Sequence, residues 1–253
     1  MTNKLRVLLC AVSVVLVTVV SSSAEEDAVS VSASADVVSK YVWRGQNVVD
    51  DWVLQPSVGI GYKGFTASVW GNMDLHGDAV DDGELNEVDY VIDYSNTFPG
   101  QEILAYSVGA IYYDFPNTSF PGTAEIYGGL SASVPLSPSV TWFYDFDEAD
   151  GSYFQFSVGH GVEKVAQWTT DAYCDLEVGA SLAYASGGYD DYYFGVDDSA
   201  FNDLTLSAGV PVTIGNWTIK PIVAYSTMID SDIREATGKS DNLWGGISIA
   251  VEF

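Results

Sequence analysis

The feature that most constrains this chain is a two-residue alternation of apolar and polar side chains, repeated in segment after segment. Residues 203–210, for example, read Asp-Leu-Thr-Leu-Ser-Ala-Gly-Val. Because successive side chains of a β-strand point to opposite faces, the alternation predicts strands with one apolar and one polar face. Past residue 24, no segment of comparable length carries an apolar stripe of helical period. The sequence therefore predicts an all-β fold.

Twelve strands are predicted, an even number, most of them about ten residues long or longer. They cover residues 30–44, 52–62, 65–75, 85–97, 102–115, 124–134, 138–146, 152–162, 173–185, 201–212, 217–226 and 243–253. Short connections (63–64, 99–100, 135–137, 213–216) are interleaved with long ones (45–51, 76–84, 116–123, 186–200, 227–242). Residues 147–151 are a shorter connection, and residues 163–172 a longer one, than this alternation predicts.

Two architectures suit such strands, a soluble β-sandwich or jelly roll and a transmembrane barrel. Strands of soluble sheets average about 5–6 residues, whereas a tilted strand needs ~9–11 to cross a bilayer. Even strand numbers and alternating loop lengths are typical of outer-membrane barrels. The final strand ends on Phe253, which resembles the signal read by the barrel-assembly machinery. We therefore expect an antiparallel up-and-down transmembrane β-barrel over residues 25–253, with that machinery as a partner.

Two further features favour the membrane barrel. Residues 1–24 combine Lys4 and Arg6, an apolar run and small residues ending at Ala24, which predicts a cleaved secretory signal peptide; the run is short for the alternative, a membrane anchor. Aromatic side chains fall near predicted strand ends, as in interfacial girdles. These are Trp43, Trp52, Tyr62, Phe65, Phe98, Phe115, Trp142, Tyr184, Trp217, Tyr225 and Trp244. The expected location is the cell outer membrane, reached through the periplasm.

The charge balance narrows the partners. The chain has 9 Lys and Arg against 35 Asp and Glu, a formal net charge of −26. Phosphate backbones require clustered positive charge, so nucleic acid is excluded as a partner. The expected partners are outer-membrane lipid and lipopolysaccharide, together with small solutes or cations. The Asp-rich loops lack a spaced calcium-binding pattern, so solvated loops are favoured over divalent-cation sites there.

In a barrel the polar strand faces point inward. This places acidic side chains in or near the lumen, where rings of carboxylates favour cations. The candidate pore-lining or ion-binding residues are Arg44, Glu87, Asp89, Asp93, Glu125, Asp175, Glu177, Asp203 and Glu252, with Asp145 also facing inward. Arg44 either holds a lumen carboxylate or anchors a strand end beside Trp43, and the second is favoured. Twelve strands are ambiguous between an open and a filled lumen. A cation-preferring pore is therefore favoured over a plugged structural or adhesive barrel.

A barrel hydrolase is the third alternative, and the sequence disfavours it. Only His76 and His160 are present, and His160 lies an odd number of positions from Ser157, so the two point to opposite faces of a regular strand. Zinc-ligand spacing, a phosphate-binding glycine loop and a nucleophile elbow are all missing from the sequence. We expect no enzyme activity, no catalytic residues, no metal and no cofactor.

One segment resembles a known family. Residues 34–45 read SADVVSKYVWRG, followed by Gln55-Pro56 and by Gly64-Phe65 through Trp70-Gly71-Asn72. This run is similar to the start of a family of proteins from Gram-negative bacteria described as outer-membrane porins (TorF-like), which open on S-x-D-[FV]-V-S-x-Y-x-W-R-G. The resemblance covers roughly the first 75 residues and is looser beyond them. It implies an outer-membrane barrel with a transport role.

Overall fold

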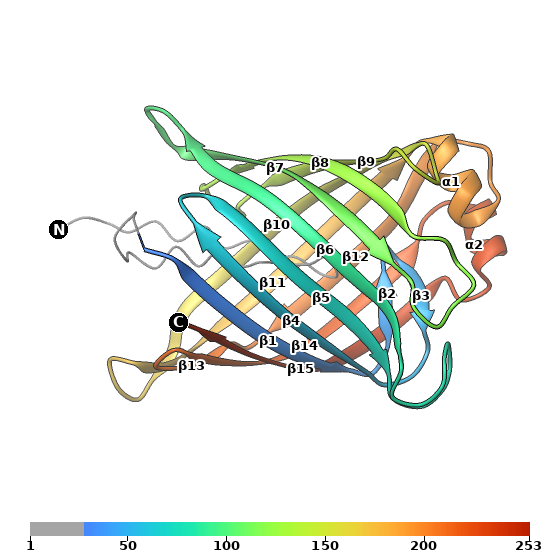
Figure 1. Cartoon of the computed structure of the whole chain (residues 1–253). Coiled ribbons are helices and arrows are strands. Elements are labelled where there is room, and N and C mark those ends of the chain that lie inside the picture. The colour runs from blue at the N-terminus through green and yellow to red at the C-terminus, as the bar shows by residue number, and fades with distance from the viewer. Residues whose placement is uncertain (1–27) are drawn as a thin grey trace.

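Twelve strands of the chain form one closed antiparallel barrel (Figure 1). The computed structural model describes residues 28–253, so the predicted signal peptide lies outside the described residues. The barrel strands are β1 (Ser30–Val38), β4 (Val53–Tyr62), β5 (Phe65–Asp74), β6 (Leu85–Phe98), β7 (Gln101–Asp114), β8 (Thr123–Ala132), β9 (Ser139–Asp145), β10 (Gly151–Gln167), β11 (Ala172–Ala185), β12 (Ala200–Gly209), β14 (Trp217–Met228) and β15 (Asp241–Glu252). The predicted fold class and strand count are confirmed.

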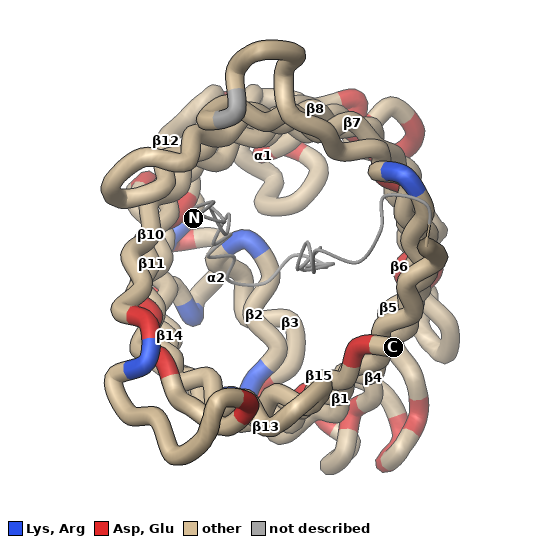
Figure 2. The backbone as a smooth tube through the Cα atoms, turned by 90° about the vertical axis from the view of Figure 1, so that its left-hand side faces the viewer, with Lys and Arg blue, Asp and Glu red and all other residues tan. Residues whose placement is uncertain are grey.

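The ring closes where the first strand meets the last. β1 pairs with β15 on one side and with β4 on the other, with Val38 opposite both Gly246 and Val53. Every other barrel strand pairs with its neighbours in the chain, and Figure 2 shows the resulting ring end-on. The short β13 (Val212–Ile214) follows β12 after Pro211 and pairs with β11 and β14. Closure leaves the barrel without a free sheet edge.

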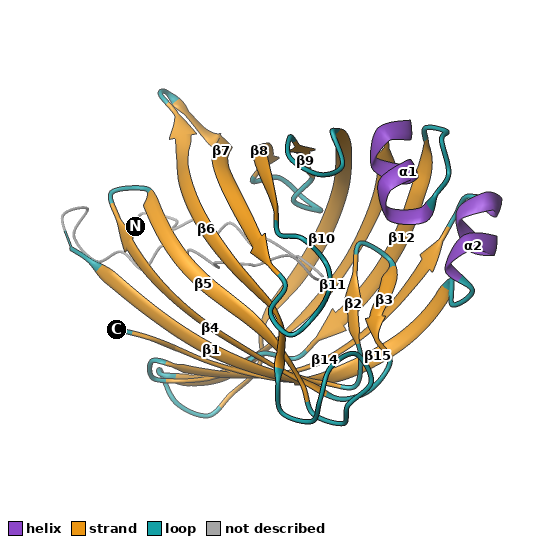
Figure 3. Cartoon of the chain, turned by 45° about the vertical axis from the view of Figure 1, so that its right-hand side comes forward, coloured by secondary structure: helices purple, strands orange, loops and turns teal. Residues whose placement is uncertain are grey.

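The two ends of the barrel differ. The start of β1, the C-terminus and the short turns lie at one end, which we call the turn end, and the longer connections lie at the opposite loop end (Figures 1 and 3). At the turn end Lys63 (φ 50°) and Gly64 (φ 83°) join β4 to β5, as a tight hairpin requires. β10 continues to Gln167, so the predicted long connection over residues 163–172 is wrong and reduces to residues 168–171.

The outward face of the barrel is apolar. Val58 and Ile60 on β4, Ile92 on β6 and Leu130 on β8 all point outward, and their exposed fractions lie between 52% and 64%. Strands of 10–14 residues carry this surface. Within residues 28–253, no helix has the length and apolar character needed to cross a membrane. A closed barrel with such a surface is compatible with an outer-membrane protein.

The first predicted strand, residues 30–44, is wrong in its second half. β1 ends at Val38, and the chain then turns into the barrel as a hairpin of β2 (Tyr41–Trp43) and β3 (Gln46–Val49), visible inside the ring in Figure 2. Residues 45–51, predicted as an outer loop, belong to this hairpin. Arg44 and Gly45 form its two-residue turn, with φ values of 46° and 78°. Two consecutive positive φ values define the turn that matches strand twist.

Two short helices at the loop end were not predicted (Figure 3). α1 (Gly187–Phe194) lies between β11 and β12, and α2 (Ser231–Thr237) lies between β14 and β15. The Asp230 side chain caps α2 by accepting hydrogen bonds from the backbone N–H groups of Asp232 and Ile233. Both helices end at a left-handed glycine, Gly195 and Gly238. Each is too short for a helical stripe to emerge from the sequence.

Candidate functional site

The hairpin formed by β2 and β3, here called the lumen hairpin, crosses the interior near the loop end. Its stem packs through Tyr41, Val42 and Val49 into a buried apolar cluster with wall residues of β1, β4, β14 and β15. Its tip meets the wall at β12 and β14, because a Cβ atom on Gly45 would lie 2.5 Å from the Asp203 Cβ atom. A glycine therefore occupies the tip for reasons of both space and backbone conformation.

Arg44 fastens the tip to the wall. Its two terminal nitrogens donate parallel hydrogen bonds of 2.8 and 2.7 Å to the two carboxylate oxygens of Glu125 on β8. The Arg44 side chain is 1% exposed and that of Glu125 is 0% exposed. The structure therefore supports a lumen carboxylate contact for Arg44, the alternative that the sequence did not favour. Because the pair is bidentate and fully buried, Glu125 fixes the position of the guanidinium and also balances its charge.

Aromatic rings surround the Arg44 guanidinium. Its central carbon lies 4.5 Å from the ring centres of Trp43 and Phe143 and 4.4 Å from that of Tyr153, with Tyr189 at 5.6 Å. The Tyr189 hydroxyl also accepts a 3.2 Å hydrogen bond from the guanidinium. We call Glu125, Phe143, Tyr153 and Tyr189 the lumen cage. Cation–π attraction and the carboxylate both favour a cation at its centre.

Further carboxyl groups lie around this centre. Glu125 accepts a 2.9 Å hydrogen bond from the Tyr113 hydroxyl, and Asp203 accepts one of 2.6 Å from that of Tyr153. On β6, the carboxyl groups of Glu87 and Asp89 contact each other, and both side chains are buried. The wall thus carries four buried carboxyl groups near the hairpin, which itself carries one buried cation. Four of the acidic residues that the sequence predicts for the lumen are therefore gathered near the hairpin.

Ion pairs and a hydrogen bond hold the base of the hairpin to two connections at the loop end. Lys40 and Lys239 both bind the carboxylate of Asp50, and the Asp50 backbone N–H donates a 2.7 Å hydrogen bond to Asp78. Hydrogen bonds from Lys239 and Lys40 hold the pKa of Asp50 well below its usual range. Lys239 belongs to the α2–β15 connection and Asp78 to the β5–β6 connection. The hairpin is therefore joined to two connections at the loop end of the barrel.

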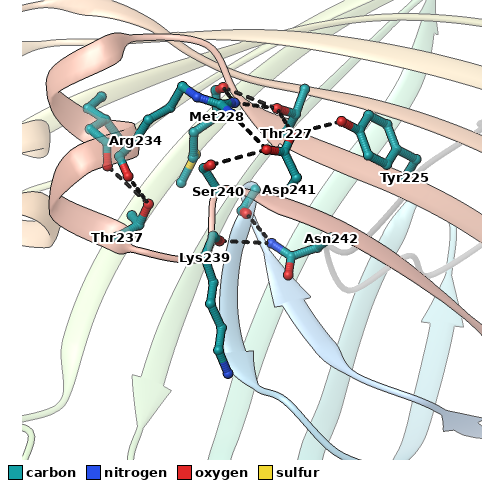
Figure 4. A network of polar contacts seen from close by, with 11 residues as sticks. Tyr225, Thr227, Met228, Arg234, Thr237, Lys239, Ser240, Asp241 and Asn242 are labelled. Atoms are coloured by element: carbon teal, nitrogen blue, oxygen red, sulfur yellow. Dashed lines mark hydrogen bonds and ion pairs between the residues drawn. The ribbon is translucent and has the colours of Figure 1, made fainter.

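The α2 connection is itself anchored (Figure 4). Arg234 donates hydrogen bonds to Asp241 at 2.7 Å, to the Thr227 hydroxyl at 2.9 Å and to the Met228 carbonyl at 2.8 Å. Next to it, the Asn242 amide donates a 3.4 Å hydrogen bond to the carbonyl of Gly45 at the hairpin tip. These contacts connect the loop-end network to the lumen.

The other predicted lumen residues lie farther from the hairpin. Asp93 accepts a 2.7 Å hydrogen bond from the Tyr127 hydroxyl, and Glu177 pairs with Lys220 at 3.8 Å. Asp175 accepts from the backbone N–H of Lys164, and Glu252 is half-buried near the end of β15. The structure therefore brings Arg44, Glu87, Asp89, Glu125 and Asp203 together and leaves Asp93, Asp175, Glu177 and Glu252 dispersed toward the turn end. Asp145 receives backbone N–H groups from residues 147–149.

Little space remains beside the hairpin. A polar pocket there has a volume of about 10 Å³, enough for roughly one water molecule. It is lined by Val42, Arg44, Gly45, Tyr153, Gln155, Ser181, Asp203, Thr205 and Ser226. Toward the turn end, inward side chains such as Ser57, Ser157 and Lys220 keep partial exposure. The lumen is thus tightly packed at the hairpin, and its side chains are more exposed toward the turn end.

The aromatic residues of the cage, and Tyr113 beside Glu125, were missed in the sequence. Tyr113, Phe143 and Tyr153 occupy inward positions of their strands, where the strand pattern alone assigns them to the lumen, and Tyr189 comes from the unpredicted α1. Two of the predicted girdle residues are also misplaced, because Trp43 lies on the hairpin and Trp244 is a buried inward residue. The sequence does show aromatic residues on the otherwise polar faces of β7, β9 and β10, and these could have indicated the cage.

The histidines are not combined into a site. His160 is exposed on the outward face of β10 while Ser157 points inward, and His76 lies 3.6 Å from Asp51 at an exposed position. Over residues 28–253, no group of three or more His, Cys, Asp or Glu side chains is arranged to hold a metal ion.

A buried carboxyl group in α1 predicts a pH effect. Asp190 is 0% exposed; Asn202 donates a 2.8 Å hydrogen bond to one of its oxygens, and the other oxygen has no partner. Burial, assisted by the charge of Asp230, raises the pKa of Asp190 to about 7. A folded-state pKa above the unfolded value means that the folded loop binds the proton more tightly. The contribution of protonated Asp190 to the stability of the folded loop is therefore fully present below about pH 4 and is lost as pH rises to about 7.

We expect amide hydrogen exchange in α1 to accelerate between pH 4 and pH 8 by more than the intrinsic chemistry, corresponding to about 1–2 kcal/mol of local opening. Asp190→Asn should remove this extra dependence, because the amide stays neutral. Asp191→Asn, one position along the same helix and exposed, is the control and should leave it intact. An unchanged pH profile in Asp190→Asn would contradict the assignment.

Comparison with known proteins adds no relative. The chain matches no protein-family model, and a search of curated proteins gives no significant match.

Proposed function

We propose that this protein is an outer-membrane pore, narrowed by the lumen hairpin, that passes small cations. The observation that carries the proposal is the excess of buried carboxyl groups around the hairpin: Glu87, Asp89, Glu125 and Asp203 against Arg44. Carboxylates at the narrowest point of a lumen attract cations and repel anions. The tight packing there leads us to expect a small conductance that depends on hairpin movement.

The N-terminal resemblance supports the same proposal. Residues 34–45, which are similar to the opening of the TorF-like porins, form the end of β1 and the first half of the lumen hairpin, including the Arg44-Gly45 turn. We propose that the protein belongs with these porins and is inserted in the outer membrane after export. A gel-mobility shift on boiling of the membrane fraction tests that location.

The plugged structural barrel is the second candidate, favoured by the complete burial of the Arg44–Glu125 pair. Planar-bilayer recording in a tenfold KCl gradient separates the two. The proposed pore should show small currents with a reversal potential displaced toward the cation limit of about 59 mV. Folded, inserted protein that carries no current would reject the pore in favour of the plug.

The lumen carboxylates should set the selectivity. Asp89→Asn combined with Glu177→Gln should reduce the reversal potential by about half, because both groups lie on inward faces. Glu235→Gln on the exposed surface of α2 removes the same type of charge outside the lumen and should have no effect. A reversal potential that stays unchanged in the Asp89→Asn, Glu177→Gln variant would contradict a carboxylate-lined path.

A further inference from the structure

We infer that the lumen cage is a binding site for an organic cation with a planar guanidinium or amidinium group, and that Arg44 is its built-in occupant. The incoming cation would displace Arg44 and release the lumen hairpin. This inference deepens the proposed pore by naming a class of solute. Its binding step is measurable without any current, so the two proposals can fail separately.

The cage belongs to the wall and not to the hairpin. Glu125 lies on β8, Phe143 on β9, Tyr153 on β10 and Tyr189 on α1. Of the groups packed around the guanidinium, Trp43 comes from the hairpin itself. When the hairpin leaves, three rings and the carboxylate therefore stay together as a site.

The contacts define what fits. The two oxygens of Glu125 receive the two terminal nitrogens of the guanidinium, while the Arg44 Nε atom has no hydrogen-bond partner. A ligand therefore needs a flat fork of two N–H donors and nothing at the third nitrogen, which guanidinium and amidinium groups supply. An alkylammonium group presents a point charge and cannot make the same parallel pair. The rings of Phe143 and Tyr153, whose centres lie 4.5 and 4.4 Å from the guanidinium carbon, add cation–π attraction.

The electrostatic surroundings favour a cation there. Among the described residues, Arg44 is the cationic side chain that is buried, whereas Asp89, Glu125 and Asp203 are buried close to it, and the buried Glu87 contacts Asp89. An emptied cage would retain carboxyl groups in a poorly hydrated space, which is costly unless a positive group replaces the guanidinium. The same charges exclude anionic solutes.

An emptied cage can be made with little disturbance of the turn. Arg44 has a φ of 46°, a conformation that glycine adopts freely, so Arg44→Gly keeps the two-residue turn while removing the occupant. The probe is n-propylguanidine, which reproduces the arginine side chain. We expect saturable binding to the detergent-solubilised variant by titration calorimetry, with a Kd below about 1 mM. Wild-type protein should bind at least tenfold more weakly, because Arg44 competes from within the same chain.

Three controls make the result specific. Propylammonium should bind Arg44→Gly at least tenfold more weakly than propylguanidine, and adding Glu125→Gln should weaken propylguanidine binding at least tenfold. Lys40→Ala removes a positive charge from the same hairpin but leaves the cage occupied, so it should gain no binding. Should Arg44→Gly fail to fold, Arg44→Lys retains a cation without the fork and should still bind propylguanidine at least tenfold more tightly than wild type.

The inference is overturned if folded Arg44→Gly or Arg44→Lys shows no saturable binding, or if binding persists unchanged after Glu125→Gln. In that case Arg44 is a structural clamp only. Saturable propylguanidine binding by Arg44→Gly, together with folded, inserted protein that carries no KCl current in bilayers, overturns the pore and leaves the binding site standing.

Discussion

Removal of the lumen hairpin is expected to raise the single-channel conductance at least tenfold. Val38 and Val53 are directly paired across β1 and β4, so residues 39–52 can be replaced by an Asn-Gly turn that closes the two strands without altering the barrel register. The deletion removes the stem, the Arg44 tip and the pocket wall beside it. What remains across the lumen is side chains of the barrel and α1, and a twelve-stranded ring is wider than the eight-stranded barrels whose interiors side chains fill.

The matched control is the β7–β8 connection. Residues 117–121 lie at the same end of the barrel and are mostly exposed, so replacing them with a short glycine-rich link shortens a loop without touching the lumen. Conductance of this variant should equal that of the wild type. Equal conductance of the hairpin deletion and the wild type would mean that another element, α1 being the nearest, closes the lumen.

The barrel itself follows from the sequence because its signal is local and repeated. Period-two alternation fixes strand faces, and inward placement of Glu87, Asp89 and Asp93 follows from their spacing on one strand. Turn residues such as Lys63-Gly64 mark the strand ends. None of these inferences requires knowing which strands are neighbours.

The hairpin could not be predicted by the same means. Residues 41–43 are apolar and aromatic on both faces because both faces are buried inside the barrel, so the alternation that marks wall strands fails there. An Arg-Gly turn with positive φ at both positions is an uncommon choice beside Asn-Gly. The apolar run Tyr-Val-Trp before that turn was the feature of the sequence that could have indicated a strand inside the barrel.

The cage depends on contacts that are distant in the sequence. Glu125 is 81 positions from Arg44, and Tyr189 is 145 positions from it. A strand pattern assigns Glu125 to the lumen but cannot identify which inward side chain it meets, because that depends on where the hairpin tip reaches. The excess of acidic residues indicated a cation in the lumen, and in the structure that cation is the protein's own Arg44.

Glu125→Gln is expected to destabilise the folded protein by about 3–5 kcal/mol. The amide has nearly the size of the carboxylate and can keep a hydrogen bond with Tyr113, so the loss comes from a buried guanidinium without its charge partner. Asp89 lies close enough to Arg44 to offset part of the charge, which favours the lower end of the range. Urea unfolding in micelles, followed by gel mobility and tryptophan fluorescence, measures the effect.

The protein contains its own comparison for this effect. Arg234 and Asp241 form a pair with the same 2.7 Å separation as Arg44 and Glu125, but their side chains are 39% and 46% exposed. Asp241→Asn should therefore lower the free energy of unfolding far less than Glu125→Gln does, because water solvates the arginine that is left behind. Adding Arg44→Met to Glu125→Gln should recover part of the loss, since no unpaired charge then remains buried. If both pairs cost the same to break, solvent reaches the lumen cage freely, and Arg44 does not seal the barrel.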